Sequence, residues 1–166
     1  PNGAIETRRA FSDAMDVITA PNHPLARQSS VSVAELSGEP LLLASYMNPV
    51  SGSLVNRELE RRGLPPMRLQ PASERTQTES EWLMQVSSGF GISFMPRIAA
   101  RQSFWDLAIL PLNDMELDFD LYIACRRNNE NPALKLFLDL LAKQPINTLN
   151  GGTADDKTGE YFTLPA

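Results

Sequence analysis

The distribution of apolar residues along the chain is the feature that most restricts its fold. Short runs of apolar and β-branched residues alternate with segments in which apolar residues recur every three or four positions. The runs predict strands and the periodic segments predict helices. Alternation of this kind is typical of an α/β domain with a largely parallel sheet and helices on both faces. We expect strands at residues 16–20, 41–45, 67–72, 92–95, 107–112 and 117–125, and helices at 32–38, 54–63, 76–89, 97–102 and from residue 131 onward.

Gly89, Phe90 and Gly91 join a predicted helix to a predicted strand. Gly89 stands where a helix C-cap needs left-handed backbone, and Gly91 lets a strand begin beside close neighbours. We expect Phe90, between them, to fill the core. A phosphate-binding glycine loop follows a strand and opens a helix, so the order found here excludes that use. We interpret the segment as a structural connection that orients the preceding helix.

Several functional classes are disfavoured by composition. The net charge is −5 and no long run of Lys or Arg occurs, which argues against a nucleic-acid surface in this chain. His23, the single histidine, lies in a turn between prolines, where we expect an exposed ring rather than a catalytic partner of a serine or of Cys125. No Cys/His spacing suits a metal. We therefore expect no enzyme activity, no cofactor and no metal site.

The lone cysteine and the lengths of the apolar runs bear on localisation. Cys125 cannot form an internal disulfide, which is typical of a reducing compartment. No apolar stretch reaches about 18 residues, the length that a membrane span needs. The chain starts at Pro1 without a signal peptide. We expect a piece of a longer, cytoplasmic protein.

Three stretches together resemble one family. ITAPNHPLARQSSVSVAELSGEPLLLAS is similar to the strand, turn, short helix and strand of the effector-binding domain of LysR-type transcriptional regulators. LMQVSSGFGISFMPRIAARQ resembles that family's helix, Gly-x-Gly, strand and proline, and LYIACRRNNENPALKLFLDLLAK resembles its last strand and closing helix. The order and spacing of these stretches, over about residues 15–144, carry the resemblance.

The resemblance implies a fold like that of type-2 periplasmic binding proteins, in which two α/β subdomains enclose a cleft for a small molecule. It assigns residues 1–14 to the end of a preceding subdomain or linker, 15–113 to the second subdomain, 114–144 to a return toward the first, and 145–166 to a tail. The family's winged helix-turn-helix and most of its first subdomain have no counterpart here. The resemblance therefore implies an N-terminally truncated fragment, mainly the second Rossmann-like subdomain.

The family places effector contacts in two loops of this subdomain, one after the strand at 41–45 and one before the Trp82 helix. Physical arguments agree, because ligands bind beyond the carboxyl ends of parallel strands and a helix N-terminus favours a carboxylate. For each hydroxyl the alternative is simple helix capping. The effector-binding residues that the resemblance implies are Ser45, Tyr46, Met47, Asn48, Ser51, Ser53, Arg75, Thr76, Gln77 and Thr78.

Effector sensing is the function that these expectations favour. Closure of the cleft on a small, anionic metabolite would change how subunits pack and so how the DNA-binding domains sit. The resemblance also implies DNA contact only through the absent domain, no membrane partner, and a dimer or tetramer when full length. The alternative is a solute-binding protein of a transporter, which shares the fold but is periplasmic. The unpaired cysteine and the HPLA stretch favour the regulator.

Overall fold

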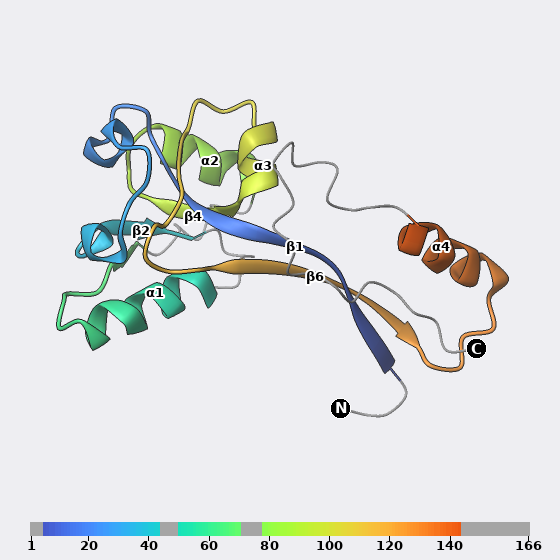
Figure 1. Cartoon of the computed structure of the whole chain (residues 1–166). Coiled ribbons are helices and arrows are strands. Elements are labelled where there is room, and N and C mark those ends of the chain that lie inside the picture. The colour runs from blue at the N-terminus through green and yellow to red at the C-terminus, as the bar shows by residue number, and fades with distance from the viewer. Residues whose placement is uncertain (1–4, 44–49, 71–77, 144–166) are drawn as a thin grey trace. The chain divides into compact units, whose positions relative to one another are not determined.

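The computed structural model describes residues 5–43, 50–70 and 78–143 (Figure 1). These residues form two compact units. The core unit is Asp13–Phe119, and the flanking unit holds the described residues of Pro1–Ser12 and Asp120–Ala166. Strand β1 (Ile5–Thr19) belongs to both, because the boundary falls between Ser12 and Asp13.

The described strands form a four-stranded sheet and a two-stranded sheet, and their pairing is mixed. Strands β2 (Pro40–Leu42) and β3 (Arg68–Gln70) pair in parallel, and Leu41 forms a further parallel bridge with Ile92, next to β4 (Ser93–Pro96). β1 lies between β4 and β5 (Ala108–Leu110) and is antiparallel to both. β6 (Asp118–Arg126) also pairs with β1. The α/β class is confirmed, but β1 corrects the expectation of a largely parallel sheet. Periodicity reveals that a strand exists and carries no information on its direction.

Alternation along the strands divides the core into two layers. On β1, Val17 packs into one hydrophobic cluster and Ile18 into the other, and Leu41 and Leu42 divide in the same way on β2. Successive strand side chains point to opposite faces, so each strand supplies both layers. The first layer contains residues of α1 (Val50–Arg61) and of the short 3₁₀ helices η1 (Pro24–Arg27) and η2 (Val33–Leu36), and the second contains residues of α2 (Glu79–Ser87) and α3 (Arg97–Gln102).

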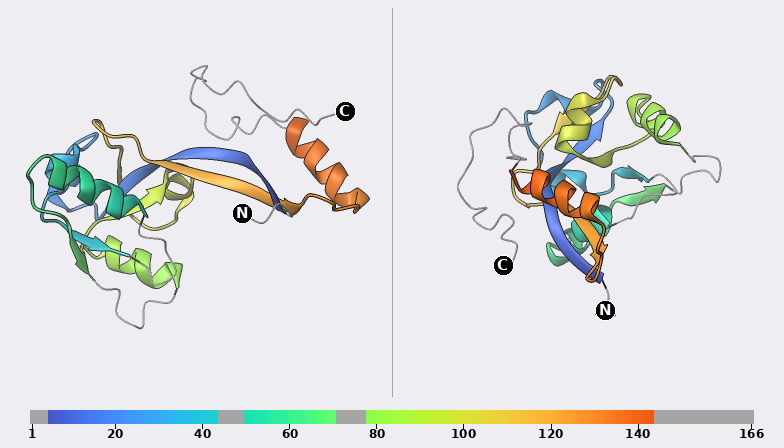
Figure 2. Two further views of the ribbon diagram at one scale, coloured as in Figure 1. Left: turned by 90° about the horizontal axis from the view of Figure 1, so that it is seen from below. Right: turned by 90° about the vertical axis from the view of Figure 1, so that its right-hand side faces the viewer.

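Figure 2 shows α1 and α2 on opposite sides of the β2–β3 pair. Helices on both faces, as the sequence predicts, are therefore confirmed for the core unit. The predicted helix at 32–38 is the 3₁₀ turn η2, opened by a capping box in which Glu35 Oε2 accepts from the Ser32 N–H at 2.8 Å. α1 begins at Val50, four positions before the predicted start at residue 54. η1 was not predicted as a helix.

The two glycines around Phe90 have different roles. Gly89 adopts φ +83° and ends α2, where its N–H donates to the Val86 carbonyl and the Phe90 N–H to the Gln85 carbonyl. A Cβ at Gly91 would collide with the carbonyl oxygen of Pro40, because the chains of β2 and β4 meet there. Phe90 is 66% exposed, so the expectation that it fills the core is wrong. The Gly89 cap turns the chain at the end of α2, and the Phe90 side chain stays at the surface there.

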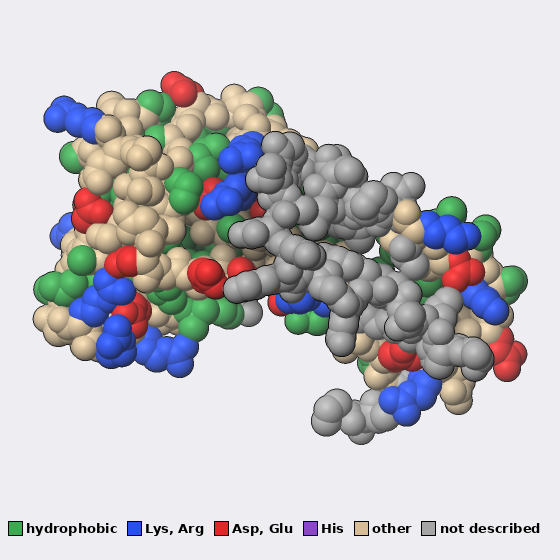
Figure 3. Space-filling model, viewed as in Figure 1, with side chains coloured by type: hydrophobic (Ala, Val, Ile, Leu, Met, Phe, Trp, Pro, Cys, Tyr) green, Lys and Arg blue, Asp and Glu red, His purple; other side chains and the backbone are tan. Residues whose placement is uncertain are grey.

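The flanking unit consists of the first part of β1, most of β6 and helix α4 (Pro132–Lys143). No strand was predicted for residues 5–12, yet they extend β1. Asp120 accepts hydrogen bonds from Tyr122, at 3.2 Å, and from Arg9, at 3.5 Å. Figure 3 shows hydrophobic side chains at the surface over α4. The large exposed ones on this helix are Leu136, Phe137 and Leu140.

Candidate functional site

Three helices of the core unit begin at one edge of the sheet. Leu42 and Gln70, the last residues of the parallel strands β2 and β3, are register partners. β4 continues from a segment that is parallel to β2 at the Leu41–Ile92 bridge. Each of these strands leads into a helix, α1, α2 or α3 respectively. The helix N-termini that follow parallel strands therefore belong to the carboxyl edge, where α/β sheets bind their ligands.

The first turn of α1 contains two of the residues expected to contact an effector. Ser51 is half-buried and Ser53 is exposed, and neither hydroxyl bonds to another described residue. Gly52, between them, is buried against Leu41, where a Cβ would lie 2.5 Å from Leu41 Cδ2. Close packing at Gly52 thus holds the first turn of α1 against the end of β2. The expected residues Ser45, Tyr46, Met47 and Asn48 lie outside the described residues.

Thr78 is the N-cap of α2. Its Oγ1 accepts from the Glu81 N–H at 3.2 Å, and Glu81 Oε2 accepts from the Thr78 N–H at 3.2 Å. This reciprocal capping box satisfies two N–H groups at the helix start. The capping role foreseen as the alternative for such hydroxyls is therefore present at Thr78. Arg75, Thr76 and Gln77, the other residues expected in this loop, lie outside the described residues.

The start of α3 is held by two carboxylates of β1 that sequence reasoning missed. Asp13 Oδ2 accepts from the Ile98 N–H at 2.7 Å, and Asp16 receives two bonds of 2.8 Å from Arg97. The hydrogen bond with Asp16 raises the pKa of Arg97 above its ordinary value. The sequence does contain a signal for this role, because Asp13 and Asp16 stand at the start of an apolar run that predicts a strand. A carboxylate buried by such a strand requires a hydrogen-bonding partner.

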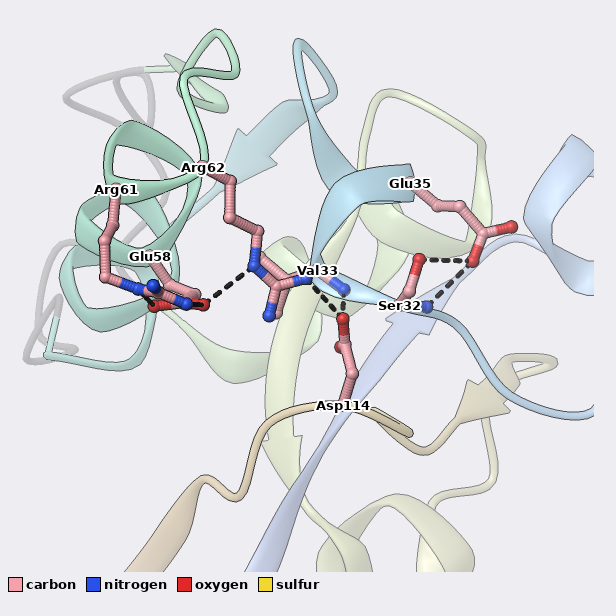
Figure 4. Close-up of polar contacts among 7 residues, drawn as sticks. All are labelled: Ser32, Val33, Glu35, Glu58, Arg61, Arg62 and Asp114. Carbon is pink, nitrogen blue, oxygen red and sulfur yellow. Dashed lines mark hydrogen bonds and ion pairs between the residues drawn. The ribbon is translucent and has the colours of Figure 1, made fainter.

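A second polar network lies at the opposite end of α1 (Figure 4). Glu58 Oε1 accepts from Arg61 at 2.6 Å and from Arg62 at 2.7 Å, and Arg62 also contacts Asp114 at 2.5 Å. Asp114 in turn accepts from the Val33 N–H at 2.8 Å. The bonds from Arg61 and Arg62 lower the pKa of Glu58 to about 2. Burial raises the pKa of Asp114, but the bonds from Arg62 and Val33 outweigh this effect and the net shift is downward. The network fastens α1 to η2 and is structural in character.

His23 caps a short helix. Its Nδ1 accepts from the Leu25 N–H at 3.3 Å, and its Nε2 lies 3.5 Å from Glu39. The side chain is only 14% exposed, so the expectation of an exposed ring is wrong. The ring is largely buried because it caps the helix.

Within the described ranges, no group of three or more His, Cys, Asp or Glu side chains is arranged to hold a metal. Among the described helices, none is long and apolar enough to span a membrane.

The comparison with known families decides the affiliation. Residues 1–145 match the family model described as the LysR substrate binding domain. The chain belongs to this family. Among LysR-type relatives, the transcriptional regulator AlsR of Bacillus subtilis (strain 168) is 27% identical over 76% of this chain and 41% of its own length. The regulator BudR of Raoultella terrigena is 25% identical over 82% of this chain and 46% of its own length. This LysR-type chain thus spans less than half the length of these curated relatives.

Solved structures confirm the LysR effector-domain fold. The BenM effector binding domain with its effector benzoate is 23% identical, with a TM-score of 0.66 over 85% of this chain and 63% of that chain. The effector binding domain of QuiR in complex with shikimate is 22% identical, with a TM-score of 0.64 over 84% of this chain and 65% of that one. The fold expected from the resemblance, that of type-2 periplasmic binding proteins, is therefore confirmed.

Proposed function

We propose that this chain is the effector-sensing part of a LysR-type transcriptional regulator and that it binds a small carboxylate at the carboxyl edge of β2, β3 and β4. Membership in the family is the observation that carries the proposal. The solved BenM domain holds benzoate and the solved QuiR domain holds shikimate, and both molecules are carboxylates. The curated relatives AlsR and BudR are named as transcriptional regulators, which supports regulation over catalysis and over solute transport.

The N-terminus of α1 is the part of this edge that best suits an anion. The α3 terminus already holds the Asp13 carboxylate, and the α2 terminus holds the Thr78 hydroxyl. At α1, the Ser51 and Ser53 hydroxyls bond to no other described residue. Main-chain N–H groups and the partial positive charge of a helix start stabilise a carboxylate. We keep Ser45, Tyr46, Met47, Asn48, Ser51, Ser53, Arg75, Thr76, Gln77 and Thr78 as proposed contact residues.

Binding of benzoate and shikimate, followed by ¹H–¹⁵N NMR of the 166-residue chain, tests this proposal. We expect the amide signals of residues 50–53 to shift with either carboxylate and to stay in place with the neutral analogue benzamide. The variant Ser51→Ala/Ser53→Ala should bind about tenfold more weakly, since each lost hydrogen bond is worth roughly 0.5–1.5 kcal/mol. Ser37→Ala, next to the amino end of β2, is the matched control and should bind normally. Equal shifts with benzamide would contradict an anion site.

The remaining expectations concern the whole protein. We propose that residues 15–113 are the second effector-binding subdomain, flanked by 1–14, 114–144 and a tail at 145–166; the compact core unit Asp13–Phe119 supports this. We also propose a cytoplasmic regulator that is a dimer or tetramer and contacts DNA through a winged helix-turn-helix outside this chain. The net charge of −5 supports the last point. A band-shift assay with the 166-residue chain should show no retarded duplex, and a retarded band with a steep salt dependence would contradict it.

A further inference from the structure

Strand β1 is attached to the start of α3 by two buried carboxylates. Asp16 is 1% exposed and receives both Arg97 bonds, while Asp13 is 7% exposed and accepts from the Ile98 N–H. Met15 lies between the two aspartates and is the register partner of Pro96, the last residue of β4. The two contacts therefore continue the β1–β4 pairing into the start of α3. We call Asp13, Asp16, Arg97 and Ile98 the β1–α3 latch.

The composition of the latch suggests a role beyond packing. Two carboxylates taken out of water lose hydration, and apolar side chains of similar volume often stabilise a core as well as a buried ion pair does. What polar contacts add is a fixed geometry, because both carboxylates accept charge-assisted or short bonds, of 2.7 and 2.8 Å. The latch thus sets the position of β1 relative to α3 more strictly than apolar contact would.

The latch also stands at a particular point of the chain. Asp13 is the first residue of the core unit on β1, and the strand continues from Ser12 into the flanking unit without a break. Asp13, the core residue next to this boundary, therefore fixes the backbone of β1 where the strand passes into the flanking unit. By contrast, Asp114 uses the same chemistry, an Arg and a backbone N–H, but joins η2 to α1 within the core unit.

We infer that the β1–α3 latch couples the position of α3 to the rigidity of β1 where that strand enters the flanking unit. Any displacement at the start of α3 is passed to residues 9–12 through the continuous strand. This device does not need the proposed effector site. If a carboxylate does bind at the carboxyl edge, where α3 begins, the latch gives it a route to β1; that extension alone rests on the proposed function.

Amide hydrogen exchange of the 166-residue chain, read by NMR, tests the inference. In Asp13→Asn and Asp16→Asn, we expect exchange at residues 9–12 to become about tenfold faster, with α1 and α2 unchanged. Arg97→Lys should produce the same pattern, although Arg97 is not on β1, because Lys cannot make both bonds. Asp114→Asn is the matched control and should leave residues 9–12 unaffected. Asp13→Asn keeps the shape of the side chain, so it stays informative if Asp16→Asn does not fold.

Three outcomes would overturn the latch. Faster exchange confined to α3 and residues 13–16 would reduce it to local packing. Uniformly faster exchange throughout the core unit would reduce it to a general contribution to stability. If residues 9–12 already exchange at the unprotected rate in the wild-type chain, the carboxylates stabilise nothing beyond Asp13.

A double variant gives a further test. Because Asp16→Asn and Arg97→Lys break the same interaction, the double variant Asp16→Asn/Arg97→Lys should speed exchange at residues 9–12 no more than either single variant does.

Discussion

The hydroxyl of Ser93 donates a 2.7 Å hydrogen bond to the carbonyl oxygen of Leu42, and both residues are buried. Leu42 ends β2 and Ser93 begins β4, so this bond joins two strands of the carboxyl-edge arrangement. The backbone adds two bonds nearby, from the Leu42 N–H to the Ile92 carbonyl at 2.9 Å and from the Ile92 N–H to the Pro40 carbonyl at 2.8 Å. The end of β2 is therefore positioned by both main-chain and side-chain contacts.

Ser93→Ala should lower the free energy of unfolding by about 1–2 kcal/mol, because the Leu42 carbonyl loses a buried donor. Ser37 provides the matched control: its hydroxyl donates to the Pro65 carbonyl at 2.9 Å, but at the surface. There water replaces the lost partner, so Ser37→Ala should change stability by less than about 0.5 kcal/mol. Urea denaturation measures both values. Equal losses in the two variants would show that burial of the Ser93 bond is unimportant.

Gly91→Ala should destabilise the chain by roughly 3 kcal/mol or prevent folding, because the added methyl group meets the Pro40 carbonyl oxygen. Gly38→Ala is the comparison, since Gly38 has φ +74° and no other atom lies within 4 Å of the place that an alanine methyl group would take. It suffers only backbone strain, about 1 kcal/mol. Thermal denaturation followed by circular dichroism ranks the two variants. A smaller loss for Gly91→Ala than for Gly38→Ala would contradict close strand contact at Gly91.

The lowered pKa of Glu58 predicts that the folded chain loses stability in acid. Its pKa is lowered in the folded chain to about 2 by the bonds from Arg61 and Arg62, against an ordinary value of 4.5. Its contribution is therefore complete above about pH 4.5 and is lost as the pH falls toward 2. NMR titration of the Glu58 carboxyl should give the low pKa, and Arg61→Gln should raise it. Glu58→Gln should flatten the fall in stability over this pH range, whereas Glu60→Gln should not.

The exposed apolar side chains of helix α4 predict that the isolated chain self-associates. Leu136, Phe137 and Leu140 lie within one turn of each other and are more than half exposed, at 61%, 51% and 53%. An apolar stripe of this kind favours contact with another surface. Sedimentation velocity should show concentration-dependent association that Phe137→Glu weakens and Lys135→Ala leaves unchanged. A monomer at all concentrations would contradict the prediction.

Local signals located most of the helices and their ends. Gly89 was correctly predicted as a helix C-cap, and the capping pair Ser32 and Glu35 lies within the helix predicted at 32–38. Such signals act over three or four residues. The helix predicted at 76–89 is α2, whose Trp82, Leu83 and Val86 form a buried apolar stripe. These features need no knowledge of the rest of the chain.

Features that depend on distant residues could not be read in this way. Residues 5–12 show no apolar alternation because their part of β1 lies in the flanking unit, where most side chains stay exposed. The direction of β1 and the burial of Asp13 and Asp16 depend on β4 and α3, some 80 positions away in sequence. Of the expected effector residues, only Ser51, Ser53 and Thr78 lie among the described ones, and only Thr78 has a side-chain role in the structure.

The division of the core into two layers limits how this chain can change in length. Val17 and Ile18 are adjacent yet serve opposite layers, as do Leu41 with Leu42 and Phe94 with Met95. Inserting or deleting one residue in such a strand exchanges every inward side chain between the layers. Conservative replacements keep both layers apolar, whereas a single-codon insertion in β1 misplaces both at once. Evolution of these strands is therefore open to substitution and closed to small changes in length, which leaves the connections between them as the places where homologous chains can differ in size.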